Sequence, residues 1–292
     1  DEVAKKDKVK RSEPRRICTA SSKGGVTKTS TTLELAAQLA EMGDTVLILD
    51  LDSSSDLSTK LGLFNPEDED SYPPLTLINA IVSDKRDTTK LADIVCETPY
   101  ENLLIAPSDA ALGEEFIAMK GGRPGPIRLR DVVDEYLVDN PDGIDWLLID
   151  CPADIGPGTE AGIAAADEIL IPVDLKDEKA VDAIYNVAEL AWQMRGDGPK
   201  DGIFVVQVKH LKQAPSVDRN MDLVSDNPFP VAKTIVPDRR AVFNFHNDNR
   251  LLAYEADSKG GKEASKTYKK LAKEIRSGEL HGGPLVDPAG GE

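Results

Sequence analysis

The chain has 292 residues, of which 40% are hydrophobic and 30% charged, and its formal net charge is −17. This composition is typical of a soluble globular protein with a large core, and the absence of a run of about 18 apolar residues argues against a membrane span. The acidic balance opposes a protein-wide attraction to nucleic acid, so DNA binding would require a local basic patch.

Residues 1–15 form a basic arm without hydrophobic periodicity, which we expect to be flexible. Apolar runs and helical patterns then alternate. The predicted strands are 16–20, 45–50, 102–106, 146–150, 168–173, 202–208 and 231–236. The predicted helices are 28–42, 76–82, 90–95, 109–119, 127–138, 159–166, 178–195, 215–225 and 262–277. This alternation predicts an α/β fold, with a mostly parallel twisted sheet flanked by helices on both faces. One domain is expected over 16–277, with a flexible tail at 278–292.

Residues 23–30 read Lys-Gly-Gly-Val-Thr-Lys-Thr-Ser, between a predicted strand and a predicted helix. In this context the backbone N–H groups of a glycine-bearing turn hold phosphate oxygens, and the helix N-terminus adds partial positive charge. Lys28 is placed to reach the β- and γ-phosphates, and the Thr29 hydroxyl to ligate Mg²⁺. The expected phosphate-binding residues are Lys23, Gly24, Gly25, Val26, Thr27, Lys28, Thr29 and Ser30.

Thr27 departs from the common loop, G-x-x-x-x-G-K-[ST], because it stands at the second glycine. Such loops alternate right- and left-handed residues, and glycine usually takes the left-handed places. A β-branched residue there costs roughly 1–2 kcal/mol. We therefore expect strain at Thr27, which would reshape the loop and slow or abolish hydrolysis.

Carboxylates follow two apolar runs of the kind found in buried parallel strands. Residues 45–52 end in Asp50-Leu51-Asp52, and residues 146–150 end in Asp150. Because parallel strands present their carboxyl ends at one edge of a sheet, both groups are expected beside the loop. Asp150 has the setting of a Mg²⁺ ligand. The alternative for Asp50 and Asp52 is that they are ordinary residues at the end of a strand.

The loop with its additional Lys23 resembles the deviant Walker A motif of the ParA/MinD superfamily. The segments 103–115, 161–174 and 235–237 resemble ParA proteins as well. The resemblance implies an ATPase with ATP and Mg²⁺ as cofactors, and a homodimer in which Lys23 reaches across to the partner's nucleotide. It implies catalytic roles for Lys23, Lys28 and Asp52. It also implies metal contacts from Thr29, Asp52 and Asp150, and places Pro237 and Asp238 near adenine.

ParA proteins bind DNA without sequence preference, and a ParB-like partner stimulates their hydrolysis. By resemblance, the best candidates for DNA contacts are Arg239 and Arg240, which follow the segment at 235–237. Further candidates are Lys209, Lys212, Arg219 and Arg250, with solvated surface charge as the alternative for all six. The few, widely separated cysteines are typical of reduced thiols, so we expect a cytoplasmic, nucleoid-associated protein. A MinD-like membrane cycle is not expected, because residues 278–292 lack a basic apolar stripe.

Three other functions remain open. Strain at Thr27 would suit a dimer locked by ATP that acts as a binding module with little hydrolysis. A relative that positions another cargo would share the same motifs. A metabolic ligase or an electron carrier on this fold is the third possibility, although Cys96 and Cys151 lack the flanking glycines of a cluster-binding site.

Overall fold

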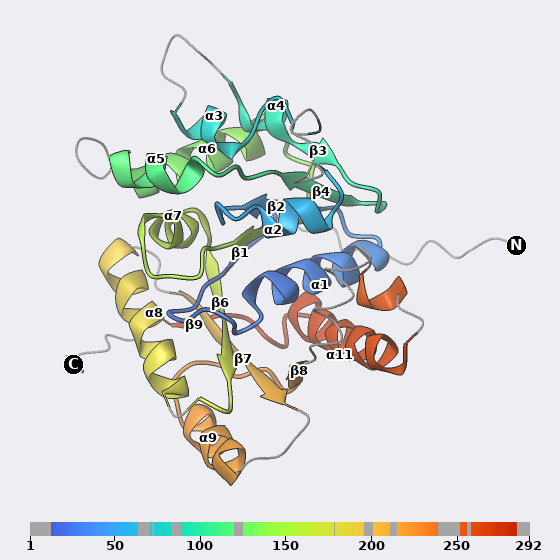
Figure 1. Cartoon of the computed structure of the whole chain (residues 1–292), viewed down its shortest axis with the longest axis vertical. Helices are drawn as coiled ribbons and strands as arrows, with labels where there is room; N and C mark the ends of the chain where they lie inside the picture. Colours follow the sequence, from blue (N-terminus) through green and yellow to red (C-terminus); the bar gives the residue numbers. More distant parts are fainter. Residues whose placement is uncertain are drawn as a thin grey trace, which may run out of the picture.

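The computed structural model describes residues 13–63, 71, 73–82, 89–119, 125–177, 179–195, 201–210, 215–238, 252–255 and 258–284. Its strands are β1 (Arg15–Thr19), β2 (Val46–Asp50), β3 (Cys96–Glu97), β4 (Leu103–Ala106), β5 (Trp146–Asp150), β6 (Glu168–Asp174), β7 (Asp201–His210), β8 (Val236–Asp238) and β9 (Gly283–Pro284). Its helices are α1 (Lys28–Glu41), α2 (Asp56–Lys60), α3 (Leu77–Val82), α4 (Leu91–Ile94), α5 (Leu112–Met119), α6 (Gly125–Asp139), α7 (Pro157–Ala165), α8 (Ala180–Arg195), α9 (Pro215–Ser225), the 3-10 helix η2 (Ala253–Glu255) and α11 (Lys259–Arg276) (Figure 1).

The described strands form one sheet in the order β3-β4-β2-β5-β1-β6-β7-β8, with β9 paired to β7. All neighbours are parallel except β3 on β4 and β9 on β7. The mostly parallel α/β fold expected from the sequence is therefore confirmed. The central strand β1 lies between β5 and β6, so the loop that follows it emerges at the middle of the carboxyl edge.

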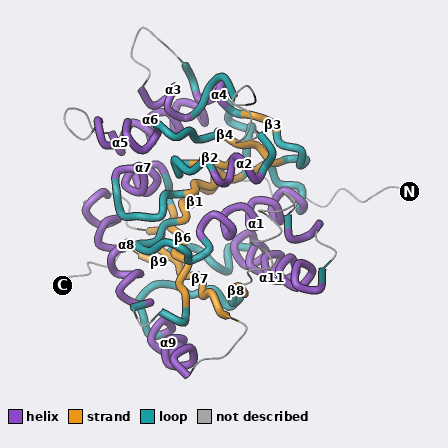
Figure 2. Tube along the Cα trace, in the orientation of Figure 1, coloured by secondary structure: helices purple, strands orange, loops and turns teal. Residues whose placement is uncertain are grey.

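The two faces of the sheet form two separate apolar cores, because side chains alternate along a strand. On β2, Leu47 and Leu49 belong to the core that is covered by α3 to α9. Val46 and Ile48 of the same strand belong to the core beneath α1, α2 and α11. Figures 1 and 2 show this arrangement, with α1 and α11 side by side and α7 and α8 across the sheet from them.

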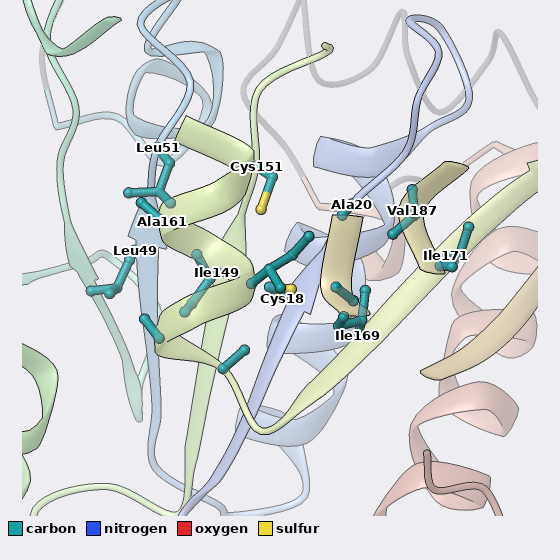
Figure 3. Close-up of a cluster of buried hydrophobic side chains, with 14 of the residues drawn as sticks. Cys18, Ala20, Leu49, Leu51, Ile149, Cys151, Ala161, Ile169, Ile171 and Val187 are labelled. Carbon is teal, nitrogen blue, oxygen red and sulfur yellow. The ribbon is translucent and has the colours of Figure 1, made fainter. Parts of the chain in front are cut away.

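Close packing of α7 fixes the end of β5. Cys18 of β1 and Ile149 of β5 face α7, which carries Ala161 (Figure 3). At Gly162 an added Cβ would lie 2.4 Å from the sulfur of Cys151, so only glycine permits this approach. Cys151 directly follows Asp150, and the helix therefore packs against the backbone that carries this carboxylate. Cys18 and Cys151 are buried free thiols, as their apolar setting predicted.

Most predicted elements lie where the sequence placed them, but the last strand is shifted. Residues 231–236 were predicted as a strand, whereas Val231 makes a single bridge to Val205 and regular pairing begins at Val236. Between them, Glu274 of α11 accepts hydrogen bonds from the Lys233 N–H and the Thr234 hydroxyl, which replaces strand pairing. The elements α2, β3, β9 and η2 were not predicted, because each is short.

The predicted boundary of the flexible tail at residue 278 is wrong. Leu280 is buried, its N–H donates to Glu274 O, and Gly283 pairs with Ile203 of β7. Packing therefore continues to residue 284, and 285–292 lie outside the described residues. The predicted arm ends too late, because Arg15 already belongs to β1, while residues 1–12 also lie outside the described part. Among the described helices, none combines the length and apolarity that crossing a membrane requires.

Candidate nucleotide-binding site

The loop between β1 and α1 has the backbone shape that phosphate binding requires. Gly25 and Thr27, two residues apart, are both left-handed, with φ of 76° and 65°. Left-handed residues at alternate positions turn successive N–H groups into one concavity. Thr27 precedes α1, and its side chain does not cap the helix. The first N–H groups of α1 therefore keep their donors for another acceptor, beside the positive end of the helix dipole.

Thr27 adopts the strained conformation that its position in the motif predicted. Its φ and ψ are 65° and 23°, and its side chain is buried, with the hydroxyl 3.4 Å from that of Thr31. A β-branched residue in this region costs about 1–2 kcal/mol. The loop keeps the shape found with glycine, so the strain is carried by the backbone and the loop is not reshaped as expected.

Lys28 extends from the first turn of α1 into a group of carboxylates. It is buried, and its Nζ donates to the carbonyl oxygen of Lys23 at 3.3 Å. Burial lowers the pKa of Lys28, while the negative charges of Asp150 and Asp52 act in the opposite direction. The loop lysine and both predicted strand-end carboxylates are thus brought together, as the sequence predicted.

Asp150 is held at the end of β5 by α1. The Thr32 hydroxyl donates to Asp150 Oδ1 at 3.0 Å and lies 2.9 Å from the hydroxyl of Thr19. Burial raises the pKa of Asp150 to about 6, and this rise is opposed by the hydroxyls of Thr29 and Thr32 and by the charge of Lys28. A cation bound here would favour the ionised carboxylate.

Two buried polar atoms show that the residues fit a phosphate group and a cation. Asp150 Oδ2 and the hydroxyl of Ser30 are buried and have no hydrogen-bond partner within the described parts of the chain. Unpartnered buried polar atoms are costly, and they are usually satisfied by a ligand, a metal or water. Both belong to the motifs that the sequence assigned to phosphate and Mg²⁺, and the donor set suits Mg²⁺, which prefers oxygen ligands.

Asp50 and Asp52, at the end of β2, have different environments. Asp50 is buried, and its Oδ2 accepts hydrogen bonds from the N–H of Ser58 at 3.0 Å and from the Ser58 hydroxyl at 2.6 Å. Its other oxygen accepts from the N–H of Asp52 at 3.2 Å. Asp52 is only partly buried, and it accepts from Ser54 N at 2.9 Å. Asp50 therefore fixes the turn into α2, while Asp52 is left closer to solvent and to Lys28.

Lys23 forms an ion pair within its own chain. Its ammonium contacts Asp177, which follows β6, and this contact lowers the pKa of the Asp177 carboxyl. The two side chains are 34% and 29% exposed, so the pair lies at the rim of the site. The Lys23 side chain is thus engaged by residues of the same chain, and its reach toward a partner subunit remains a prediction.

The other predicted positions lie farther along the carboxyl edge. Pro237 and Asp238 belong to β8, which is separated from β1 by β6 and β7. Lys209 is the register partner of Pro237, and Arg219 is exposed on α9. The remaining DNA candidates lie outside the described residues: Lys212, Arg239, Arg240 and Arg250.

Sequence reasoning missed three residues that build the site. Thr32 had a signal, because it follows Lys28 by four residues and so shares its helix face. Ser58 belongs to a short helix that showed no periodicity. Asp177 lies more than 150 positions from Lys23, and no local pattern links the two.

The comparison with known proteins agrees with this geometry. Residues 14–193 match the family model described as an AAA domain. The chromosome partitioning protein ParA of Caulobacter vibrioides is 29% identical over 157 residues, which are 54% of this chain and 55% of that protein. The chain thus matches about half the length of this curated relative.

Solved structures share the fold. Cobyrinic acid a,c-diamide synthase from Mycobacterium smegmatis, with bound ADP and magnesium, has a TM-score of 0.68 at 18% identity, over 94% of this chain and 100% of that one. A variant of McdA from Cyanothece, in complex with ATP, has a TM-score of 0.69 at 22% identity, over 91% and 98%. At these identities the likeness establishes the fold alone.

Proposed function

The chain belongs to the ParA/MinD superfamily of P-loop ATPases, and on that premise we propose that it is a ParA-type partition ATPase. The observation that carries the proposal is the placement of Lys23 and Lys28 around a left-handed loop, above the buried Asp150 with its unpartnered oxygen. This arrangement supports binding of a nucleoside triphosphate with Mg²⁺.

The residues of the loop have distinct roles in holding ATP. The N–H groups of residues 24–28 would bind phosphate oxygens, and Lys28 would neutralise the β- and γ-phosphates. The Ser30 hydroxyl would donate to a phosphate oxygen. Thr29, Asp52 and Asp150 would hold Mg²⁺, either directly or through water. Bound Mg²⁺ supplies positive charge next to the phosphates during phosphoryl transfer.

Hydrolysis would rely on positioning and charge stabilisation. Lys28 would stabilise charge on the γ-phosphate, and Asp52 would orient the attacking water from the more open side of the site. Lys23 would add a second positive charge from the partner subunit. Its release from Asp177 would therefore be part of dimer closure.

The proposed cycle links this site to DNA. Two subunits close over two nucleotides, and the dimer binds DNA without sequence preference through Arg239, Arg240 and the other predicted basic residues. A ParB-like protein then stimulates hydrolysis, which opens the dimer and releases DNA. The protein would act in the cytoplasm, on the nucleoid, to segregate a plasmid, a chromosome or another cargo.

A second candidate is an ATP-locked dimeric module, which the left-handed Thr27 favours. Strain in the loop would then permit binding and closure but little turnover. Phosphate release measured with duplex DNA distinguishes the two candidates, since the module releases less than one phosphate per subunit on the timescale of the assay.

Calorimetry and light scattering test the proposed function. Titration of Mg–ATP should show binding to the wild type and to Lys90→Ala, a surface control, and a large loss for Lys28→Ala. Size-exclusion chromatography with light scattering should show a dimer with a non-hydrolysable ATP analogue, and a monomer for Lys23→Ala despite retained binding. A wild type that binds no adenine nucleotide, or stays monomeric at saturating analogue, refutes the proposal.

A further inference from the structure

Helix α11 presents a row of lysines to solvent. Lys259, Lys262, Lys266, Lys269, Lys270 and Lys273 are all exposed. The opposite side of the helix is buried, largely against α1, through Gly261, Ala264, Tyr268, Leu271, Ala272 and Ile275. Packing therefore fixes which way the helix faces, and the fold keeps the lysines on the outside (Figures 1 and 2).

The charge of this face contrasts with that of the whole chain. The exposed acids beside the six lysines are Glu263 on α11, Glu41 on α1 and Glu255 on η2. Glu41 pairs with Lys269 at 3.7 Å, and Glu255 accepts a hydrogen bond from the Tyr100 hydroxyl. The lysine face is thus positive, while the complete chain carries −17. An approaching polyanion would be repelled by most of the molecule and attracted here.

The spacing of the lysines indicates what kind of polyanion fits. Successive lysines from 259 to 273 are mostly three or four residues apart, which is about 4.5–6 Å along a helix, and together they span roughly 21 Å. Duplex DNA carries one charge per about 1.7 Å of its axis, so many phosphates lie within this length. Insertion into a membrane surface would need an exposed apolar face, and the apolar face of α11 is buried.

The lysine face also adjoins the segment that contains the predicted DNA contacts. Helix α11 packs against β8, which ends at Asp238, and against η2, which begins at Ala253. Arg239, Arg240 and Arg250 lie in the stretch that joins these two elements. Lys233 is exposed on the same side, and its N–H donates to Glu274 of α11.

We infer that the exposed lysine face of α11 binds the phosphate backbone of duplex DNA. The inference rests on the proposed function, which includes DNA binding, and it assigns that binding to a surface outside the six positions predicted from the sequence. The contact is made to phosphates, so it is independent of base sequence and weakens with salt.

Fluorescence anisotropy with two unrelated 24-base-pair duplexes, in the presence of Mg–ATP, tests the inference. The test variant is Lys266→Gln, Lys270→Gln and Lys273→Gln combined. The control combines Lys90→Gln, Arg128→Gln and Arg130→Gln on α4 and α6, and it changes the net charge by the same amount. The α11 variant should bind both duplexes about 10-fold or more weakly, with a shallower salt dependence, by up to about 0.9 in slope per lost phosphate contact. The control should bind like the wild type.

Further measurements separate the failure of this inference from that of the proposed function. Lysine-to-arginine changes at the same three positions should retain binding, and a fluorescent ATP analogue should bind every variant equally. Equal losses in the two glutamine variants, or none in the α11 variant, overturn the inference and leave the proposed function intact. A wild type that binds no duplex, or prefers anionic vesicles over duplex, refutes the inference together with the DNA-binding step of the proposed function.

Discussion

Asp177 holds the ammonium of Lys23 within the same chain, and Asn220 of α9 holds Asp177 from the other side. The Asn220 side chain donates to the backbone oxygen of Asp177 at 2.9 Å and to that of Leu175 at 2.8 Å. The loop that follows β6 is therefore fixed, and Lys23 is paired with a carboxylate that does not move freely. A Lys23 that crosses to a partner's nucleotide must first leave this pair.

Asp177→Asn should therefore favour the dimer. An ion pair with side chains about one-third exposed contributes roughly 0.5–1 kcal/mol, so its loss should tighten the nucleotide-dependent dimer by about 2- to 5-fold. Sedimentation equilibrium with a non-hydrolysable ATP analogue measures this change. Asp174→Asn, three residues earlier, is the matched control and should behave like the wild type. A weaker dimer for Asp177→Asn would show that the carboxylate supports closure instead of opposing it.

Thr27→Gly should stabilise the protein and increase ATP turnover. The substitution removes about 1–2 kcal/mol of left-handed strain and adds about 0.5–1 kcal/mol of chain entropy cost, so the net gain is small. A gain of this size should raise Tm by roughly 1–4 °C. Ser55→Gly is the control, because Ser55 is also left-handed, with φ of 54°, and lies outside the phosphate-binding loop. Both variants should melt higher, and only Thr27→Gly should release phosphate faster. Unchanged turnover would mean that strain at Thr27 does not limit hydrolysis.

Thr32→Val should weaken the response of nucleotide binding to Mg²⁺. Valine keeps the shape of threonine but removes the hydroxyl that donates to Asp150 at 3.0 Å. Loss of one hydrogen bond to a charged group costs roughly 1.5–3 kcal/mol, part of which should appear as a several-fold lower affinity for Mg–ATP. Calorimetry with and without Mg²⁺ measures the difference. The neighbouring Thr31→Val, equally buried, should change both affinities little. Equal losses with and without Mg²⁺ would indicate a structural role for Thr32.

The sequence predicted those parts of the fold that rest on periodicity. The buried runs at β2 and β5 and the loop before α1 were found because continuous apolar residues and glycines have local causes. Short elements such as α2 were missed, because a few residues carry no period. The same reason explains the site: Lys28 and Asp150 follow from motifs, whereas the contact of Lys23 with Asp177 depends on tertiary packing of distant segments.

The lysine face of α11 shows a different limit of sequence reasoning. The helix was predicted and its basic content was visible, but the exposed side of a helix depends on what its apolar side contacts. Only the packing of Tyr268 and Leu271 against the fold fixes the lysines on one outward face. Similarly, the tail after Gly278 appeared disordered by composition, yet Leu280 is buried by tertiary contacts.

The pair of carboxylates at the ends of β2 and β5 predicts how stability depends on pH. Asp50 and Asp150 are register partners on neighbouring strands. Burial, and next the negative charge of Asp150, raise the pKa of Asp50 to about 7, against the effect of the hydrogen bonds from Ser58. An unfolded aspartate titrates near about 4, so between about pH 4 and 7 the folded chain keeps a proton that the unfolded chain has lost. The free energy of unfolding should therefore fall as pH rises through this window, by up to about 1.4 kcal/mol per unit.

Asp50→Asn should flatten this dependence. Asparagine is neutral at every pH in the window and keeps an acceptor oxygen for the Ser58 N–H, so the variant should be more stable than the wild type at pH 7.5 by on the order of 1–3 kcal/mol. Near pH 4.5 the two proteins should be close in stability. Urea unfolding without nucleotide or Mg²⁺ measures both curves, and a residual slope up to about pH 6 is expected from Asp150, whose pKa is raised to about 6. Asp56→Asn, at an exposed carboxylate on α2, should leave the wild-type slope unchanged. If Asp50→Asn keeps that slope too, Asp50 is already ionised in the folded chain at pH 5, and its burial does not hold the proton.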